Sequence, residues 1–244
     1  MHSRALLLIT VVCVIIGLLV RLEYYIHYPV QPRDSYKYQA FIETWEETGE
    51  MPRGHRGALS LWILKSPHLL FKVDTIRGGV IINNCLGILL IMLAIVISKR
   101  IFGKNSIALF AGLIVATHPQ LVRFSTSFLR ENTYLVFAML TLGFLLEYIR
   151  NKRLACVISA GIVSALSFLC RIEGLELTLM TFVMILFLLI QRKIKIKKAF
   201  LHSLAFIFVF CFTLAIVCVL LGLKINSIDE IMDMVEVPSG QSVI

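Results

Sequence analysis

Seven long apolar stretches dominate the pattern of hydrophobic and polar positions along the chain, and short polar segments separate them. Each holds about 17 or more mostly apolar residues, the length that a helix needs to cross a hydrocarbon core of about 30 Å. The pattern therefore predicts an all-α, polytopic membrane protein with about seven transmembrane helices. The predicted spans are residues 5–21, 77–98, 105–122, 132–149, 154–170, 175–191 and 199–223.

A helix of a different kind is predicted in the long loop after the first span, over residues 34–48. Its apolar residues recur at helical spacing and glutamates occupy the opposite face, which is typical of an amphipathic helix lying on a membrane surface. Asp34 is placed to cap its start and Gly49 to end it. The apolar positions are Tyr38, Phe41, Ile42 and Trp45.

Residues 58–73 form an eighth apolar stretch, which Lys65, Pro67 and His68 interrupt. If it crossed the membrane, every later loop would change sides, and the basic run at 191–198 would face outward against the positive-inside tendency. We therefore predict that it lies in the outer interface. The N-terminus is then cytoplasmic, and all but one of the 15 acidic residues lie outside.

Composition agrees with this topology. The chain is 58% hydrophobic and 16% charged, far from the values of soluble domains, so a soluble fold is excluded. The net charge of +9 comes from short loops with no basic domain large enough to bind nucleic acid. The six cysteines form no Cys-x-x-Cys pair or Cys/His cluster, so they predict neither a disulfide framework nor a zinc site.

Asp34 is the first candidate for chemistry on the outer face. Its ordinary interpretation is a helix cap, and its functional one is a carboxylate at the membrane surface that accepts a proton from a hydroxyl. The two roles are compatible, because a cap fixes the side chain that a general base also needs fixed.

Three arginines, Arg123, Arg130 and Arg171, lie in the later outer loops. A single arginine at the end of a span often only reaches for lipid headgroups. Arg130 and Arg171 differ in that each has an acid within two residues, Glu131 and Glu173, at the mouths of neighbouring spans. This pattern indicates a polar site in which forked guanidinium donors bind a phosphate.

The order of these motifs resembles the GT-C superfamily of membrane glycosyltransferases, and most closely the branch of dolichyl-phosphate-mannose protein mannosyltransferases and aminoarabinose lipid A transferases. The resemblance covers about residues 5–223, and it depends on the order of weak motifs on one membrane face. These motifs are Pro-Arg-Asp-Ser-Tyr at 32–36, Gly-Glu-Met-Pro at 49–52, Thr-His-Pro at 117–119, Leu-Arg-Glu at 129–131 and Cys-Arg-Ile-Glu-Gly at 170–174.

The resemblance implies transfer of a sugar from a polyprenyl-phosphate donor to a hydroxyl of a lipid, glycan or protein acceptor, with inversion, at the outer face of a bacterial plasma membrane. Asp34 would be the general base, and Glu131 and Glu173 would be the second acidic or orienting residues. Relatives often carry an Asp-Glu pair where this chain has Asp34 and Ser35, so Glu131 is the expected second acid. A divalent metal ion, if one is used, would be held by Asp34 and Glu131. The expected donor-phosphate residues are Arg130, Arg171, Arg123 and Lys65, and the other pocket residues are Tyr36 and His118.

Relatives are commonly longer, so the resemblance also implies that residues 1–223 are the transmembrane core of a longer protein and that 224–244 form an outer tail. Two other classes of function stay open on the sequence. One is a non-catalytic membrane subunit that presents lipid-linked sugars, which the short length favours. The other is a small-molecule transporter, which is disfavoured because the chain shows no repeat and because its span interiors carry no acid or base apart from Glu147 near an inner end.

Overall fold

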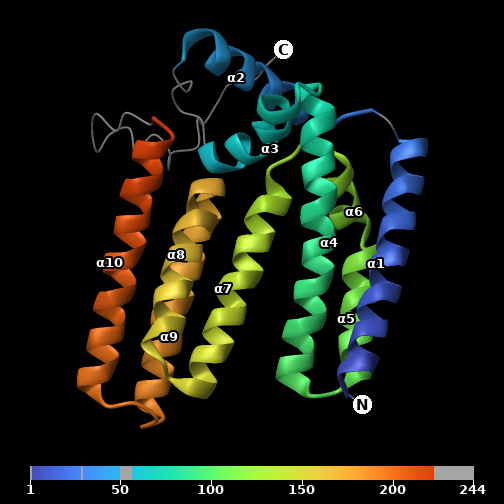
Figure 1. Cartoon of the computed structure of the whole chain (residues 1–244). Helices are drawn as coiled ribbons and strands as arrows, with labels where there is room; N and C mark the ends of the chain where they lie inside the picture. The colour runs from blue at the N-terminus through green and yellow to red at the C-terminus, as the bar shows by residue number, and fades with distance from the viewer. Residues whose placement is uncertain (1, 29, 50–56, 223–244) are drawn as a thin grey trace.

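A computed structural model describes residues 2–28, 30–49 and 57–222, and the regular structure within these ranges is entirely helical. Seven helices, α1, α4, α5, α7, α8, α9 and α10, stand side by side in a bundle, and α2 and α3 lie across one end of it (Figure 1). The bounds are α1 His2–His27, α2 Arg33–Thr48, α3 Ala58–Phe71, α4 Thr75–Phe102, α5 Asn105–Thr117, α6 Pro119–Thr126, α7 Glu131–Asn151, α8 Leu154–Cys170, the 3-10 turn η1 Ile172–Gly174, α9 Leu175–Ile190 and α10 Ile196–Leu220.

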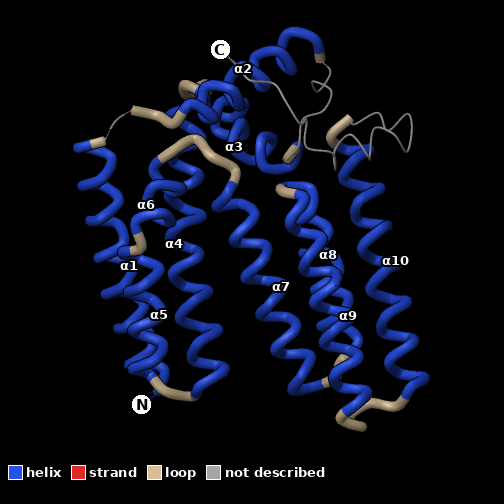
Figure 2. Tube along the Cα trace, turned by 180° about the vertical axis from the view of Figure 1, so that it is seen from behind, coloured by secondary structure: helices blue, strands red, loops and turns tan. Residues whose placement is uncertain are grey.

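The two ends of the bundle differ in character. The end that α2 and α3 cover is called the capped end below. The α4–α5, α7–α8 and α9–α10 connections meet at the opposite end, which carries the Lys- and Arg-rich loops and is called the basic end (Figure 2).

Fewer helices than predicted are long enough to cross a membrane. By length and composition, five described helices qualify, namely α1, α4, α7, α9 with η1, and α10. The bent pair α5 and α6 makes a sixth if it is one span, and α8, with 17 residues, belongs to the shorter apolar helices. The seven predicted stretches are helical within the described residues, apart from a break at His118 and the last residues of two stretches, and the number of them that cross the membrane stays a prediction.

The predicted span at 105–122 is broken into α5 and α6, which meet at an angle of 55°. Pro119 has no amide hydrogen and disfavours the helical conformation in the residue before it. His118 accordingly adopts extended angles, φ −61° and ψ 119°. The break leaves carbonyl groups at the end of α5 without the helical donors that would normally satisfy them.

Arg21 lies inside α1 and supplies a donor to this break. The sequence predicted that the first span ends at residue 21, but α1 continues to His27 and buries Arg21 to 2% exposure. Its Nη1 donates to the carbonyl oxygens of Gly17, at 3.0 Å, and Ala116, at 3.2 Å. A cation at the C-terminal end of α5 is favourable to the helix dipole, so the buried arginine stabilises the broken span. The expectation of spans without an interior cation is therefore wrong at Arg21.

Helix α2 ends at Gly49, as predicted, with the left-handed angle φ 69°. The N-cap prediction is wrong, because Pro32 occupies that position and the Ser35 amide donates to its carbonyl, so Asp34 lies within the first turn. The apolar face of α2 packs on protein: Tyr38 and Ile42 join a core cluster with residues of α3, α4 and the segment before α7. Burying two such side chains contributes on the order of 2 kcal/mol each.

Helix α3 lies across the capped end, in agreement with the prediction that residues 58–73 do not cross the membrane (Figure 1). Leu61 and Leu64 are fully buried against the same cluster, so α3 is the layer between α2 and the bundle. Three predicted features lie outside the described residues, namely residue 223 of the final span, the tail 224–244 and residues 50–52 of the Gly-Glu-Met-Pro motif.

Candidate active site

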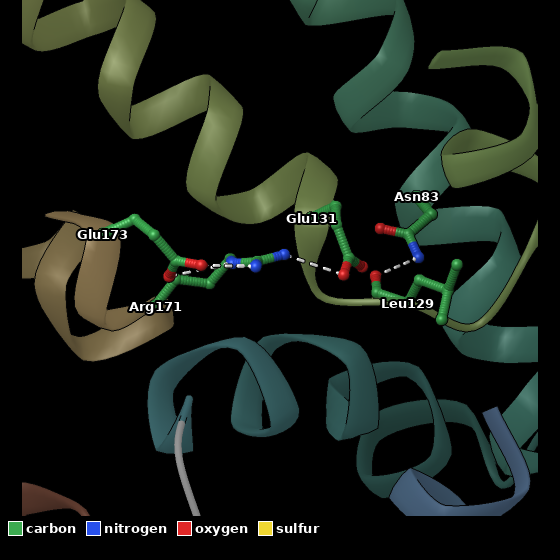
Figure 3. A network of polar contacts seen from close by, with 5 residues as sticks. All are labelled: Asn83, Leu129, Glu131, Arg171 and Glu173. Carbon is green, nitrogen blue, oxygen red and sulfur yellow. Dashed lines mark hydrogen bonds and ion pairs between the residues drawn. The ribbon is translucent and has the colours of Figure 1, made fainter. Parts of the chain in front are cut away.

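A cluster of polar and charged side chains lies at the capped end, where three segments meet. Tyr38 comes from α2, Arg130 and Glu131 from the start of α7, and Arg171 and Glu173 from the connection between α8 and α9. Figure 3 shows Arg171 between Glu173 and Glu131, close to the segment that Asn83 of α4 holds in place. The fold thus brings Glu131 and Arg171, which are 40 positions apart in the chain, into contact.

Arg171 holds two carboxylates at once. Its Nη2 lies 2.6 Å from Glu173 Oε1 and its Nε 3.1 Å from Glu173 Oε2, which is a bidentate pair. Its Nη1 lies 2.8 Å from Glu131 Oε1. The hydrogen bonds to Glu173, with the charges of both acids, raise the pKa of Arg171 against the opposing effect of burial. The guanidinium is therefore permanently charged and fixed in orientation.

Arg130 packs beside this pair. Its Cζ lies 5.6 Å from the centre of the Tyr38 ring, within the range of a cation–π interaction. The site also depends on a glycine: Gly57 has φ 95°, and a Cβ there would lie 2.6 Å from the Cys170 carbonyl oxygen and 3.1 Å from Arg130 Nη1. Only glycine fits this conformation and this space. Gly57 thus allows α3, Arg130 and the end of α8 to approach one another.

Tyr38 is the common neighbour of the charged groups. It is 8% exposed, and burial raises the pKa of its hydroxyl. The positive charge of Arg130 opposes this shift in the pKa, and Glu131, Asp34 and Arg171 also act on it. All four groups therefore lie in one electrostatic neighbourhood around the tyrosine.

Two buried asparagines position the segment that carries Arg130 and Glu131. Asn83 Nδ2 donates to the carbonyl oxygens of Ser127 and Leu129, both at 2.7 Å. Asn132 Nδ2 donates to the Asn83 carbonyl and to Ser125 Oγ, both at 3.0 Å. Both asparagines have no exposed surface, so these bonds are made in a low-dielectric interior, where they fix the segment firmly.

Sequence reasoning missed both asparagines and the role of Tyr38. The signal for Asn83 was an asparagine pair within an otherwise apolar stretch, since a polar amide in a span must find an internal partner. The sequence predicts Tyr38 on the apolar face of α2, and its ring does lie in the buried cluster. The contact between this ring and Arg130 was not predicted.

Asp34 lies at the edge of the cluster. Its side chain is 61% exposed and Oδ1 lies 3.4 Å from Lys37 Nζ, in a pair on the surface of α2. It precedes Tyr38 by about one helical turn, which places both on the same side of the helix. The carboxylate is therefore open to solvent beside the buried charges.

The other predicted pocket residues lie elsewhere. Lys65 Nζ pairs with Glu46 Oε1 at 3.2 Å and packs 5.0 Å from the centre of the Trp45 ring, so it joins α3 to α2. Tyr36 is 54% exposed, on the side of α2 away from Tyr38. His118 and Arg123 are exposed at the α5–α6 break and in α6, helices that pack on α1 and α4. The structure thus groups Arg130, Arg171, Glu131 and Glu173, with Asp34 near them.

Glu131 and Glu173 are carboxylates that could bind a metal ion, but both already pair with Arg171. Within the described ranges, no group of three or more His, Cys, Asp or Glu side chains has the arrangement to hold a metal. Glu131 Oε2 is buried and has no hydrogen-bond partner among the described residues, so it is one acceptor that a ligand could use.

The fold is that of a multi-pass helical membrane protein. A cluster of charged side chains lies at one end of its bundle, beneath the two short helices α2 and α3. Its family follows from comparison with known proteins: the family model for dolichyl-phosphate-mannose-protein mannosyltransferase matches residues 55–217. Since this is more than half of the chain, the protein belongs to that family, and the family indicates a glycosyltransferase of the GT-C type. No match was found among curated proteins or among solved structures. Arg130, Glu131, Arg171 and Glu173 lie within the matched range, whereas Asp34 precedes it.

Proposed function

We propose that the protein transfers a sugar from a polyprenyl-phosphate donor to a hydroxyl acceptor at the capped end, with inversion at the anomeric carbon. One observation carries the proposal: two guanidinium groups lie at the capped end, Arg171 bonded to Glu131 and Glu173 and Arg130 against the ring of Tyr38, one helical turn from Asp34. A base and a phosphate-binding pair are the two elements that this transfer requires.

The two arginines have different parts in the proposal. Arg171 already uses three of its five N–H donors on Glu173 and Glu131, which leaves two for a phosphate. Arg130, stacked on Tyr38, is the main contact of the leaving group. Arg171 then holds the carboxylates in place and adds charge. The negative charge that grows on the phosphate oxygen as the sugar leaves is stabilised by donors that need no reorganisation.

The proposed step is a single displacement. Asp34 takes the proton of the acceptor hydroxyl, the hydroxyl oxygen forms a bond to the anomeric carbon, and the bond from that carbon to the phosphate oxygen breaks. Polyprenyl phosphate leaves with the electron pair. Attack opposite to the leaving group inverts the anomeric centre, and the free Oε2 of Glu131 is placed to accept a bond from a sugar hydroxyl.

We place the capped end on the outer side of the membrane. The support is the gathering of Lys and Arg in the loops at the opposite end, because such loops are kept on the cytoplasmic side. A polyprenyl tail would then lie beside the bundle with its phosphate at the outer surface, level with α2 and α3.

The test uses purified full-length protein, a labelled polyprenyl-phosphate sugar and the variant Asp34→Asn, with Glu47→Gln as the control. Glu47 is an exposed carboxylate of the same helix, so the control removes the same charge. Loss of a general base lowers turnover by about a hundredfold or more, and the control should keep turnover within about twofold. Near-normal turnover in Asp34→Asn, with protein folded in both variants, would show that Asp34 is not the base.

A further inference from the structure

A shallow cavity of about 560 Å³, largely open to solvent, lies at the basic end, far from the charged cluster. Four cations line it, Lys152 and Arg153 from the α7–α8 connection and Lys197 and Lys198 from the first turn of α10. Leu154 and Leu201 complete its apolar side. The cavity is therefore a space between transmembrane helices that is positive on one side and apolar on the other.

Salt bridges among the described residues do not neutralise the positive charge of this cavity. None of the four cations forms a salt bridge with another described residue. Glu147, the one acid that the sequence places at this end, is paired with Arg100 of α4 and accepts a hydrogen bond from Asn151. Arg153, Lys197 and Lys198 are exposed and hydrated, and Lys152 is half-buried, so the four cations give this opening a positive potential that attracts anions.

Two helix N-termini add to the same field. Helices α8 and α10 both begin beside the cavity, and neither has a side-chain hydrogen bond at its N-cap. The first amide groups of a helix are donors without an intrahelical partner, and the helix dipole makes this end partly positive. Such ends bind phosphate groups in many proteins.

One residue of the lining is a buried polar side chain. His202, which is 2% exposed, lies in the lining, and its Nδ1 is 2.7 Å from the Tyr148 hydroxyl. This bond joins α7 to α10 beneath the cations. The wall therefore holds a buried polar side chain with one ring nitrogen already engaged.

Lys152, one of the four lining cations, has the left-handed angles φ 51° and ψ 33° at the C-cap of α7, where glycine is the favoured residue. Lys72 and Arg192 also have positive φ, so the conformation itself does not indicate a ligand. It does mean that this cation can be replaced by glycine without strain.

We propose that this cavity binds the phosphate headgroup of an anionic phospholipid, separately from the sugar donor at the capped end. The four cations and the two helix N-termini contact the phosphate, and the acyl chains leave along Leu154 and Leu201, of which Leu201 is 53% exposed on the outside of the bundle. The apolar side distinguishes a lipid from a soluble phosphate, which would have no use for it. Basic pockets between membrane helices bind headgroups in this way.

The experiment measures lipid binding to the purified full chain in bilayer nanodiscs by native mass spectrometry, with phosphatidylglycerol in one arm and phosphatidylcholine alone in the other. The double variant Lys197→Gln and Lys198→Gln should weaken retention of phosphatidylglycerol by about 25-fold, roughly fivefold for each cation. The matched control, Lys99→Gln and Lys104→Gln, removes two cations at the same end that do not line the cavity, half-buried Lys99 and exposed Lys104, and it should change retention by less than about twofold.

Equal loss in the two double variants would overturn the proposal, because it would mean that only the general positive field attracts lipid. A third arm with inorganic phosphate tests the soluble source: binding of phosphate with no preference for phosphatidylglycerol would also overturn it. The variant Lys152→Gly is a second test that should not destabilise the fold, since glycine adopts the left-handed angles of this position readily. We expect it to keep or raise thermal stability while retention falls about fivefold, and wild-type retention in this variant would contradict the proposal.

Discussion

The two ends of the bundle use positive charge in opposite ways. At the capped end, Arg171 is held by two carboxylates and Arg130 stacks on a buried ring, so the cations are fixed before any ligand arrives. At the basic end, four cations stand around a cavity without a salt bridge among the described residues. The arginines at the capped end hold a fixed orientation toward a ligand. The four cations at the basic end supply a positive electrostatic potential without a fixed orientation. The first arrangement suits a reaction, and the second suits the retention of a lipid.

The largest effect is expected from Arg171→Lys. The variant keeps the charge but loses the bidentate bond to Glu173 and cannot reach Glu131 in the same orientation. Transfer should fall by about a hundredfold, which corresponds to about 3 kcal/mol of barrier. The measurement is kcat with the labelled polyprenyl-phosphate sugar. A wild-type kcat in Arg171→Lys would mean that the positive charge at this position is sufficient and that the orientation of the guanidinium does not matter. The contrast between the two ends of the bundle would then disappear.

A smaller effect is expected from Asn83→Leu, which removes two hydrogen bonds to the segment before Arg130. The Leu129 carbonyl would lose its Asn83 donor, and the Ser127 carbonyl would keep only the bond from the Leu129 amide, which should cost about 2 kcal/mol of stability with a loss of turnover on the order of tenfold. The matched control is Asn84→Leu, since Asn84 Nδ2 bonds only to the Val80 carbonyl of its own helix. Thermal unfolding and kcat are measured on both. If the two variants behave alike, Asn83 has no positioning role.

The features that could be predicted from the sequence are the ones that depend on local spacing. The end of α2 at Gly49, its buried face and the failure of residues 58–73 to cross the membrane follow from periodicity and interrupting polar residues. The break before Pro119 was visible in the sequence as a His-Pro pair but was not used. The start of α2 was missed because Asp34 and Pro32 are both acceptable near a helix N-terminus.

The site was only partly predictable, because its contacts join distant segments. Arg130 and Arg171 were selected from their acids and their positions at span ends, and they do lie in one cluster. That Arg171 bonds to Glu131, or that Arg130 stacks on Tyr38, depends on how α2 and α8 meet α7. Likewise, the burial of Arg21 depends on the bend in α5, which no local pattern in α1 contains.

The most direct test of the central claim is inhibition of transfer by free polyprenyl phosphate, measured for the wild type, for Arg130→Ala and for the basic-end double variant Lys197→Gln and Lys198→Gln. If the capped end binds the leaving group, Arg130→Ala should weaken inhibition by about tenfold or more, as expected for a lost charge-assisted contact. The basic-end variant should leave the inhibition constant unchanged. Unchanged inhibition in Arg130→Ala would contradict the account.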